Sequence, residues 1–278
     1  MLSIIIPTWN NLPYLKLCVQ SIQQHTKVPY EIILHINDGS DGTLTWAKET
    51  KILHSYTPEN RGICVGVNMA ASLATMRYIV YMNDDMYCCP GWDEVIAEEI
   101  RSIPHDLFML SGTLVEPTAS GNACVRVADF GRDVNSFREA DLLSALPSLQ
   151  KPDWNGASWP PCIMPHSLWD LVGGFSIEFS PGMASDDDLS RKLWACGCRY
   201  FKGLGKCLVY HFQAKSTGRI KKNDGRKMFL YKWGMNMSVF NKHYLRRGTP
   251  FEGPLQEPDA GIIRTDKLKT WLKMKFRY

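Results

Sequence analysis

Short runs of β-branched and apolar residues alternate with helical apolar patterns through the first part of the chain. The short runs predict four strands, at residues 2–6, 31–36, 52–56 and 78–82. Apolar residues spaced three or four positions apart, such as Val65, Met69 and Leu73, predict a helix after each strand. These helices begin near residues 12, 43, 62 and 92. Because strands and helices alternate, the pattern predicts a mostly parallel sheet with helices on both faces.

The second half of the chain is less regular. Its periodicity predicts one strand at residues 107–114 and helices at residues 138–145, 186–196 and 227–244. From residue 267 onward we expect a basic amphipathic helix, with Leu268, Trp271 and Leu272 on one side.

The charge of the chain is concentrated in its last residues. The 278 residues are 45% hydrophobic and 22% charged, which is ordinary for a globular protein, and carry a net charge of +4. Residues 262–278 hold six Lys or Arg and one Asp, so this tail carries +5 and the remainder −1. A nearly neutral body is not typical of a nucleic-acid-binding protein, and no nucleic-acid partner is expected.

Cysteine usage and hydropathy favour a reducing, cytoplasmic setting. The nine cysteines are odd in number, and the pairs Cys88-Cys89 and Cys196-x-Cys198 have spacings that suit neither a common zinc site nor an easy disulfide. The short apolar run at residues 4–6 is not expected to act as a secretory segment. No apolar stretch approaches the ~18 residues that a membrane span needs.

Polar side chains follow three of the predicted strands. The letters TWN stand at residues 8–10, ND at 37–38 and NDD at 83–85. In parallel α/β sheets, ligands bind beyond the carboxyl ends of the strands. The three strand ends therefore predict one shared site.

The two carboxylates of NDD have two interpretations. Asp84 and Asp85 are ligands of the type that Mg²⁺ or Mn²⁺ prefers, and such a cation would bridge substrate phosphates. A solvated acidic turn before the helix at residue 92 explains them equally well. Asp38, in NDGSDGT, either bonds its own turn or accepts a hydrogen bond from a nucleobase imide. Trp9 either stacks on a base or packs in the core, and Arg61 is either an exposed cation or a base or phosphate contact.

Further chemistry is concentrated at Asp186-Asp187-Asp188, at His211 and in the segment that follows it. Acids favour helix N-termini, but a carboxylate facing a cleft would also serve as a general base. A histidine after a strand is either a core residue or a ligand. The segment QAKSTGRIKKNDG, residues 213–225, has the composition of a loop that folds over phosphates, or of a plain surface loop.

Taken in order, these segments resemble the family 2 glycosyltransferases of the GT-A fold, over roughly residues 2–211. The matching segments are SIIIPTWN, NDGSDGT, ENRGICVGVNMA, YMNDDM, VGGF and SDDDLSRKLWACG. The resemblance implies an α/β GT-A fold, with a Rossmann-like, mostly parallel sheet and a C-terminal helical extension. It implies a donor-binding half at residues 1–105, an acceptor and catalytic half at 106–225, and the extension with its basic tail at 226–278.

The resemblance also implies a role for each matching residue. Asp186 would be the catalytic base, and Asp85, with His211, would hold the metal. Asp84 would face the ribose. The nucleotide-binding residues would be Pro7, Thr8, Trp9, Asp38, Arg61, Asn83 and Asp84. The acceptor or phosphate-loop residues would be Gly174, Phe175, Asp187, Ser216 and Arg219.

Two positions depart from the family pattern. The metal motif begins with Asn83 rather than Asp, and Ser185 replaces an acid that is common before the catalytic Asp. A shift of one residue in the match would make Asp187 the base. The helix register, with Leu189 and Leu193 inward, favours Asp186 and leaves Asp188 structural.

The expected activity is an inverting sugar transfer with Mn²⁺ or Mg²⁺ as cofactor. The donor would be a nucleoside-diphosphate sugar, with UDP or dTDP favoured because Asp38 suits an imide N–H. The acceptor would be a hydroxyl of a glycan or glycolipid, as in polysaccharide biosynthesis.

Other functions have less support. A nucleotidyltransferase would want a Gly-rich basic loop after the first strand, and a dehydrogenase would want G-x-G-x-x-G there. A catalytically inactive sugar-nucleotide-binding module is suggested by Asn83. The basic tail would touch the inner face of a membrane, or form a solvated end.

Overall fold

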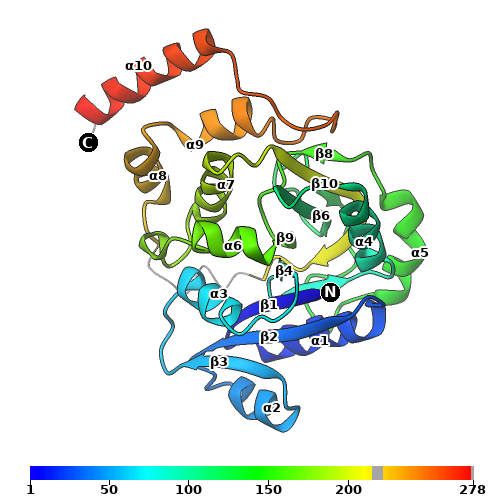
Figure 1. Cartoon of the computed structure of the whole chain (residues 1–278). Coiled ribbons are helices and arrows are strands. Elements are labelled where there is room, and N and C mark those ends of the chain that lie inside the picture. The colour runs from blue at the N-terminus through cyan, green and yellow to red at the C-terminus, as the bar shows by residue number, and fades with distance from the viewer. Residues whose placement is uncertain (215–221, 277–278) are drawn as a thin grey trace.

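The computed structural model describes residues 1–214 and 222–276. The fold is built on a ten-stranded mixed sheet (Figure 1). The main strand order is β3-β2-β1-β4-β9-β6-β10-β5, with β7 beside β6 and β8 beside β10. The strands are β1 Leu2–Trp9, β2 Tyr30–Asn37, β3 Leu53–Thr57, β4 Tyr78–Tyr81, β5 Met86–Cys88, β6 Phe108–Glu116, β7 Arg126–Val127, β8 Trp154–Asn155, β9 Cys162–Pro165 and β10 Tyr200–His211.

Most of the sheet is parallel, as the alternation of strands and helices predicts. β1 pairs in parallel with β2 and β4, β2 with β3, and β6 with β10. β9 is antiparallel to both β4 and β6, so these two strands also run in the same direction. The carboxyl ends of β1, β2, β4, β6 and β10 therefore lie along one edge, where a ligand site is expected.

The sequence pattern missed β5, β9 and most of β10. β5 and β9 are three and four residues long, too short for a clear periodicity. β10 contains Gly203 and Gly205, which weaken a strand signal. Gly203 is required by packing, because a Cβ at this position would lie 1.9 Å from the Trp154 ring.

Helices cover both faces of the sheet (Figure 1). The side chains of α1 and α4 pack on one face, and those of α3, α6 and α7 on the other. The helices are α1 Leu12–His25, α2 Thr43–Glu49, α3 Ile63–Ala71, α4 Trp92–Ser102, α5 Glu139–Leu149, α6 His166–Val172, α7 Ser185–Ala195, α8 Gly225–Trp233, α9 Met237–Val239 and α10 Ala260–Phe276.

The buried face of α3 differs from the stripe seen in the sequence. Cys64, Val67 and Ala70 are fully buried, whereas Val65 and Met69 are half-buried. Small residues face the sheet because the helix lies close to it: a Cβ on Gly66 would come within 2.7 Å of the His35 ring. Periodicity of the larger side chains therefore marked the wrong side of this helix.

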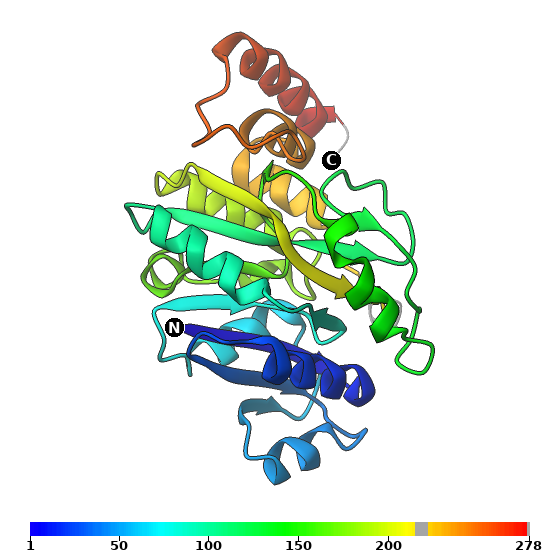
Figure 2. The ribbon, with the colours of Figure 1, turned by 90° about the vertical axis from the view of Figure 1, so that its right-hand side faces the viewer.

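The helix expected at residues 227–244 is divided. Gly234, with φ of +60°, ends α8, and a π-helical turn, Phe240–Tyr244, follows α9. Phe229 and Phe240 belong to the same core cluster as α3 and α7. Beyond this region α10 lies at the periphery of the molecule (Figures 1 and 2). None of the described helices is long and apolar enough to cross a bilayer.

Candidate active site

One cavity of about 680 Å³ opens at the carboxyl edge of the parallel strands. It brings together eight of the residues singled out in the sequence, namely Pro7, Thr8, Trp9, Asn83, Asp84, Asp85, Asp186 and His211. The ends of β1, β4, β6 and β10 and the start of α7 all contribute to its wall. The shared site predicted from three strand ends is therefore present as a single hollow.

The carboxylate of Asp84 is held in one orientation by two donors. The Thr8 hydroxyl donates to its Oδ2 at 2.6 Å, and Asn11 Nδ2 donates to its Oδ1 at 3.0 Å. Beside it, Asn83 Oδ1 accepts a hydrogen bond of 3.1 Å from the Tyr81 hydroxyl. These bonds join the ends of β1 and β4 and present oriented oxygens to the cavity.

Asp85 and His211 form a buried pair on the wall of the same cavity. Asp85 Oδ2 lies 3.4 Å from His211 Nε2, and their side chains are only 7% and 18% exposed. His211 Nδ1 lies 2.9 Å from Glu116 Oε1. Burial lowers the pKa of His211, but the carboxylates of Asp85 and Glu116 outweigh it and raise the pKa to about 10.

Glu116 was missed by the sequence analysis. It ends β6, is 5% exposed, and lines the cavity. Gln213 Nε2 and the Ser120 hydroxyl both donate to its Oε2, at 2.9 and 3.1 Å. The signal available in the sequence was an acid that closes a long apolar run, the same signal that marked Asp84 and Asp85.

The donor set suits a divalent cation. A carboxylate oxygen and an imidazole nitrogen face one cavity, and the second imidazole nitrogen is bound by a carboxylate, an arrangement typical of histidines that ligate metals. In residues 1–214 and 222–276, no group of three or more His, Cys, Asp or Glu is arranged to hold a metal ion. Further ligands would have to come from a substrate or water, as is common for Mg²⁺.

Asp186 lies in the first turn of α7 and faces the same cavity. Ala184, just before the helix, has a φ of +67°, a left-handed conformation that is uncommon for a non-glycine residue. Burial raises the pKa of Asp186 to about 7; the carboxylate of Asp187 adds to the rise, and the guanidinium of Arg247 opposes it. A carboxyl group with such a pKa exchanges a proton readily near neutral pH.

The other two acids of this run do not line the cavity. Asp187 Oδ1 pairs with Arg247 Nη2 at 2.9 Å. Asp188 is fully buried and accepts hydrogen bonds from the Ser176 hydroxyl at 2.6 Å and Trp233 Nε1 at 2.8 Å. Asp188 is thus buried among hydrogen-bond donors, as its register suggested, and of the three acids it is Asp186 that lines the cavity.

Several other predicted residues lie outside the cavity wall. Asp38 accepts a 2.8 Å hydrogen bond from Asn10 Nδ2 beside Trp9, next to the cavity but not on its wall. Arg61 turns outward, with a 57% exposed side chain paired to Glu59. Gly174 and Phe175 lie in packed positions: Phe175 is 2% exposed against Tyr81 and Trp169, and a Cβ on Gly174 would come within 2.5 Å of Asn68 Oδ1. Ser216 and Arg219 fall outside the described residues.

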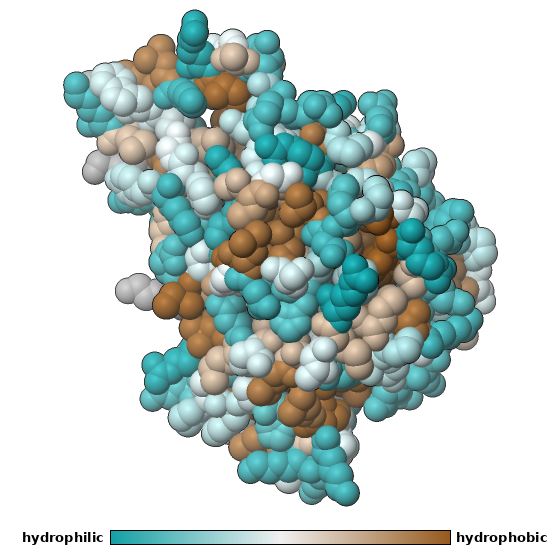
Figure 3. Space-filling view, in the orientation of Figure 1, coloured by the Kyte–Doolittle hydropathy of each residue, from teal (hydrophilic) through white to brown (hydrophobic). Residues whose placement is uncertain are grey.

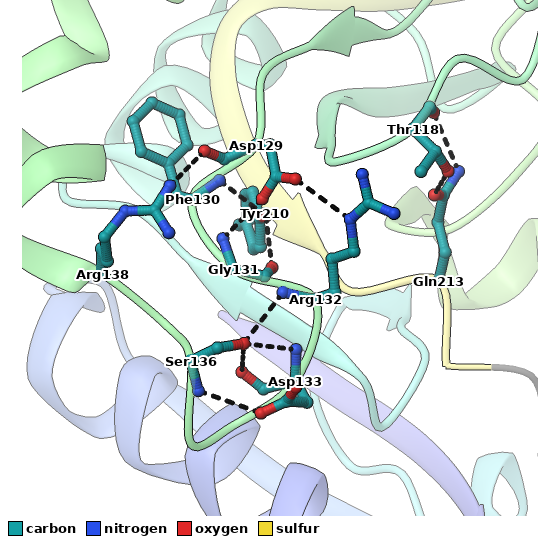
Figure 4. Close-up of polar contacts among 10 residues, drawn as sticks. All are labelled: Thr118, Asp129, Phe130, Gly131, Arg132, Asp133, Ser136, Arg138, Tyr210 and Gln213. Carbon is teal, nitrogen blue, oxygen red and sulfur yellow. Dashed lines mark hydrogen bonds and ion pairs between the residues drawn. The ribbon is translucent and has the colours of Figure 1, made fainter.

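A turn between β7 and α5 is fastened to β10 near its end at His211 (Figure 4). The Tyr210 hydroxyl donates to the Gly131 carbonyl at 2.6 Å and accepts from the Phe130 amide at 3.1 Å. Asp129 accepts from Arg132 Nε at 3.0 Å, which closes the turn on itself. The Tyr210 hydroxyl thus ties this turn to β10, one residue before His211.

Comparison with known proteins finds similarity to glycosyltransferases. Residues 3–120 match the family model described as glycosyl transferase family 2. The chain is 31% identical over 108 residues to the uncharacterized glycosyltransferase YwdF of Bacillus subtilis, covering 36% of this chain and 38% of that protein. It is 26% identical over 246 residues to chondroitin synthase of Escherichia coli, covering 82% of this chain and 31% of that protein. The chain therefore spans about a third of the length of both relatives.

Solved structures share the fold. Staphylococcus aureus TarS, residues 1–349, superposes with a TM-score of 0.57 at 15% identity, covering 76% of this chain and 60% of that one. Its complex with UDP-GlcNAc gives a TM-score of 0.58 at 14% identity, covering 83% and 64%. The chain therefore has the GT-A fold of these solved structures, and its residues 3–120 are similar to the family 2 glycosyltransferases.

Proposed function

We propose that this protein transfers a sugar from a UDP- or dTDP-sugar to a hydroxyl of a glycan or glycolipid, with inversion and with Mn²⁺ or Mg²⁺ as cofactor. The observation that carries the proposal is the content of one cavity. It holds a paired carboxylate and imidazole suited to a cation and, separately, a carboxylate whose pKa is near 7. These are the two functions that an inverting transfer requires.

The donor side of the proposal rests on Trp9, Thr8 and Asp84. Trp9 offers an aromatic surface for a base, and Asp84, held by Thr8, offers oxygens to ribose hydroxyls. The structures of TarS with UDP and with UDP-GlcNAc support a uridine nucleotide. Asp38, next to Trp9 and Asn10, is suited to accept from the imide N–H of uracil or thymine.

The chemistry assigns different tasks to the two acidic regions. Asp85 and His211 would hold the cation, which when bound supplies positive charge to the departing diphosphate. Glu116 keeps the Nε2 of His211 directed at the cavity. Asp186 takes the proton of the acceptor hydroxyl as its oxygen bonds to the anomeric carbon and the bond from that carbon to the diphosphate oxygen breaks. One displacement of this kind inverts the anomeric centre.

The test is Asp186→Asn, which keeps the shape of the side chain and removes the base. With Mn²⁺ and a panel of nucleotide sugars, the wild type should release nucleoside diphosphate, and the variant should lose at least about 100-fold in rate. Binding of UDP, measured by calorimetry, should persist in the variant. Asp170→Asn, at an exposed acid of α6, is the matched control. Transfer at a near wild-type rate in Asp186→Asn would exclude this residue as the base, and binding without turnover in the wild type would indicate an inactive module.

We further propose that α10 contacts an anionic membrane surface, where a lipid-linked acceptor would lie. Leu268, Trp271 and Leu272 are 59%, 53% and 42% exposed, and basic residues adjoin them along the helix. An exposed apolar face with Lys and Arg is typical of helices that lie in the membrane interface.

A further inference from the structure

Arg247 reaches the catalytic helix from the far end of the chain. Its Nη2 donates to Asp187 Oδ1 at 2.9 Å and to the Ser158 hydroxyl at 2.6 Å. The two charged side chains are 23% and 13% exposed, so the pair is well shielded from water. No motif in the sequence points to this arginine, which follows the π-helical turn.

The guanidinium also lies against the cavity wall. Its central carbon is 4.9 Å from the centre of the Trp159 ring, and Trp159 lines the cavity. Trp159 stacks in turn on Trp154, with ring centres 5.3 Å apart and an interplanar angle of 15°. Arg247 is therefore a member of a packed layer between the cavity wall and the start of α7.

The backbone fixes this placement. Gly156 has a φ of +89°, and a Cβ there would come within 2.7 Å of the Arg247 Cα. The Gly248 amide donates to the Asn155 carbonyl at 2.9 Å. Because the two segments touch through their main chains, the guanidinium has little freedom to leave Asp187.

Within the described part of the chain, two charged groups act on Asp186. Tyr81 on β4, Cys64 on α3 and Cys162 on β9 also face Asp186, but burial raises the pKa of each, so all three are neutral near pH 7. Asp187 and Arg247 are the charged neighbours that act on Asp186. An unpaired Asp187, so little exposed, would compete with Asp186 for a proton.

We propose that Arg247 is a positioning residue for the transfer reaction: it binds and neutralises Asp187, so that of these two adjacent carboxylates only Asp186 serves the cavity as an ionisable base. This inference rests on the role given to Asp186 in the proposed function. Two adjacent carboxylates are thereby made unequal, one structural and one free to exchange its proton.

The test follows the titration of the Asp186 carboxyl by ¹³C NMR of protein labelled at aspartate carboxyl carbons, with Asp186→Asn for assignment. In Arg247→Met, the unpaired charge of Asp187 should move the midpoint of this titration to higher pH, by about one unit. In Asp187→Asn, Arg247 remains and the competing carboxylate is gone, so the midpoint should move to lower pH. The double variant should return close to the wild-type value.

The control is Arg246→Met, which removes the same charge at the exposed neighbouring position and should leave the midpoint unchanged. Asp187→Asn is nearly isosteric, so it tests the inference even if Arg247→Met does not fold. Midpoints that stay at the wild-type value, or that move in the same direction in Asp187→Asn and Arg247→Met, would overturn the proposal.

The pH dependence of nucleotide-sugar turnover provides a second measurement. Its acidic limb should shift in the same directions as the NMR midpoint, whereas a purely structural role would lower the rate equally at every pH. The NMR titration is made without substrate, so it is independent of the proposed function. If the midpoints move as expected but Asp186→Asn still turns over the donor, the role of Asp186 as base fails while the electrostatic role of Arg247 stands.

Discussion

The three adjacent aspartates at residues 186–188 are chemically identical but have three different environments. Asp186 faces the cavity, Asp187 is neutralised by Arg247, and Asp188 is buried among donors. A helix places successive side chains about 100° apart, so neighbours in the sequence meet different partners. This explains how a run that would be costly to bury as a whole occurs at one site.

The raised pKa of Asp186 predicts that this carboxyl group, which would serve activity, lowers the stability of the folded protein at neutral and alkaline pH. The folded-state pKa, about 7, lies above the unfolded value of 3.8, so the folded protein binds more protons between these limits and loses stability as pH rises through them. Asp186→Asn removes this loss. The variant should melt a few °C above the wild type at pH 8, and the two should melt together below about pH 4. The measurement is calorimetry or circular dichroism at both pH values; a variant that is less stable at pH 8 would contradict it.

Glu116 predicts a measurable effect on metal binding. Glu116→Gln keeps the shape of the side chain but removes the carboxylate that binds His211 Nδ1. Partners of this kind typically contribute 10- to 100-fold to metal affinity, so the apparent Kd for Mn²⁺ in the presence of UDP should rise by about that factor. Electron paramagnetic resonance of free Mn²⁺ gives the Kd directly. Glu94→Gln, at an exposed acid of α4, should bind Mn²⁺ as the wild type does.

At the scale of elements, Asp188 joins α7 to α8. Its Oδ1 accepts a hydrogen bond from Trp233 Nε1 at 2.8 Å and lies 3.0 Å from Lys232 Nζ. Both partners stand at the end of α8. α7 is thereby fixed from the side opposite the cavity.

Removal of the Asp188 charge should therefore be costly. Asp188→Asn should lower the free energy of unfolding by about 3 kcal/mol, because Lys232 and Trp233 lose a buried anionic partner. Trp233→Phe removes the hydrogen bond to Asp188 and part of the ring that packs under Arg191, but leaves the Asp188–Lys232 ion pair, and should cost about 1–2 kcal/mol. Urea unfolding measures both. A loss in Asp188→Asn no larger than that in Trp233→Phe would show that the ion pair contributes little.

At the scale of the whole molecule, α10 has two unlike sides. Ile263 packs on the core and the Thr270 hydroxyl accepts from Asn236 Nδ2 at 2.9 Å, while Leu268, Trp271 and Leu272 face outward. The space-filling view shows apolar and polar surface side by side on this helix, at the upper left (Figure 3). Its attachment leaves an apolar face with basic neighbours exposed.

Liposome co-sedimentation tests what this face does. The protein should bind vesicles that contain anionic lipid, less so at high salt, and bind neutral vesicles weakly. A chain truncated before Ile263 should lose this binding. Replacing Leu268, Trp271 and Leu272 by Ser, which leaves every basic residue in place, separates the apolar contribution from the charge. Equal sedimentation of the full and truncated chains would rule out a membrane role for α10.

Local sequence determined the greater part of the fold and half of the site. The apolar periodicities and the polar strand ends depend on neighbours in the chain, and they located β1 to β4, α1, α4 and α7, together with Thr8, Asp84, Asp85, Asp186 and His211. These features are visible because each is a pattern within a few residues.

Only the tertiary structure decided the rest, because it depends on contacts between distant positions. Glu116 meets His211 across 95 residues, and Arg247 meets Asp187 across 60. β9 lies antiparallel between β4 and β6. Its pairing with these strands identifies it, whereas its short sequence shows no periodicity. The sequence favoured Asp186 but left Asp187 open as an alternative, and the fold distinguishes them by bringing Arg247 to Asp187.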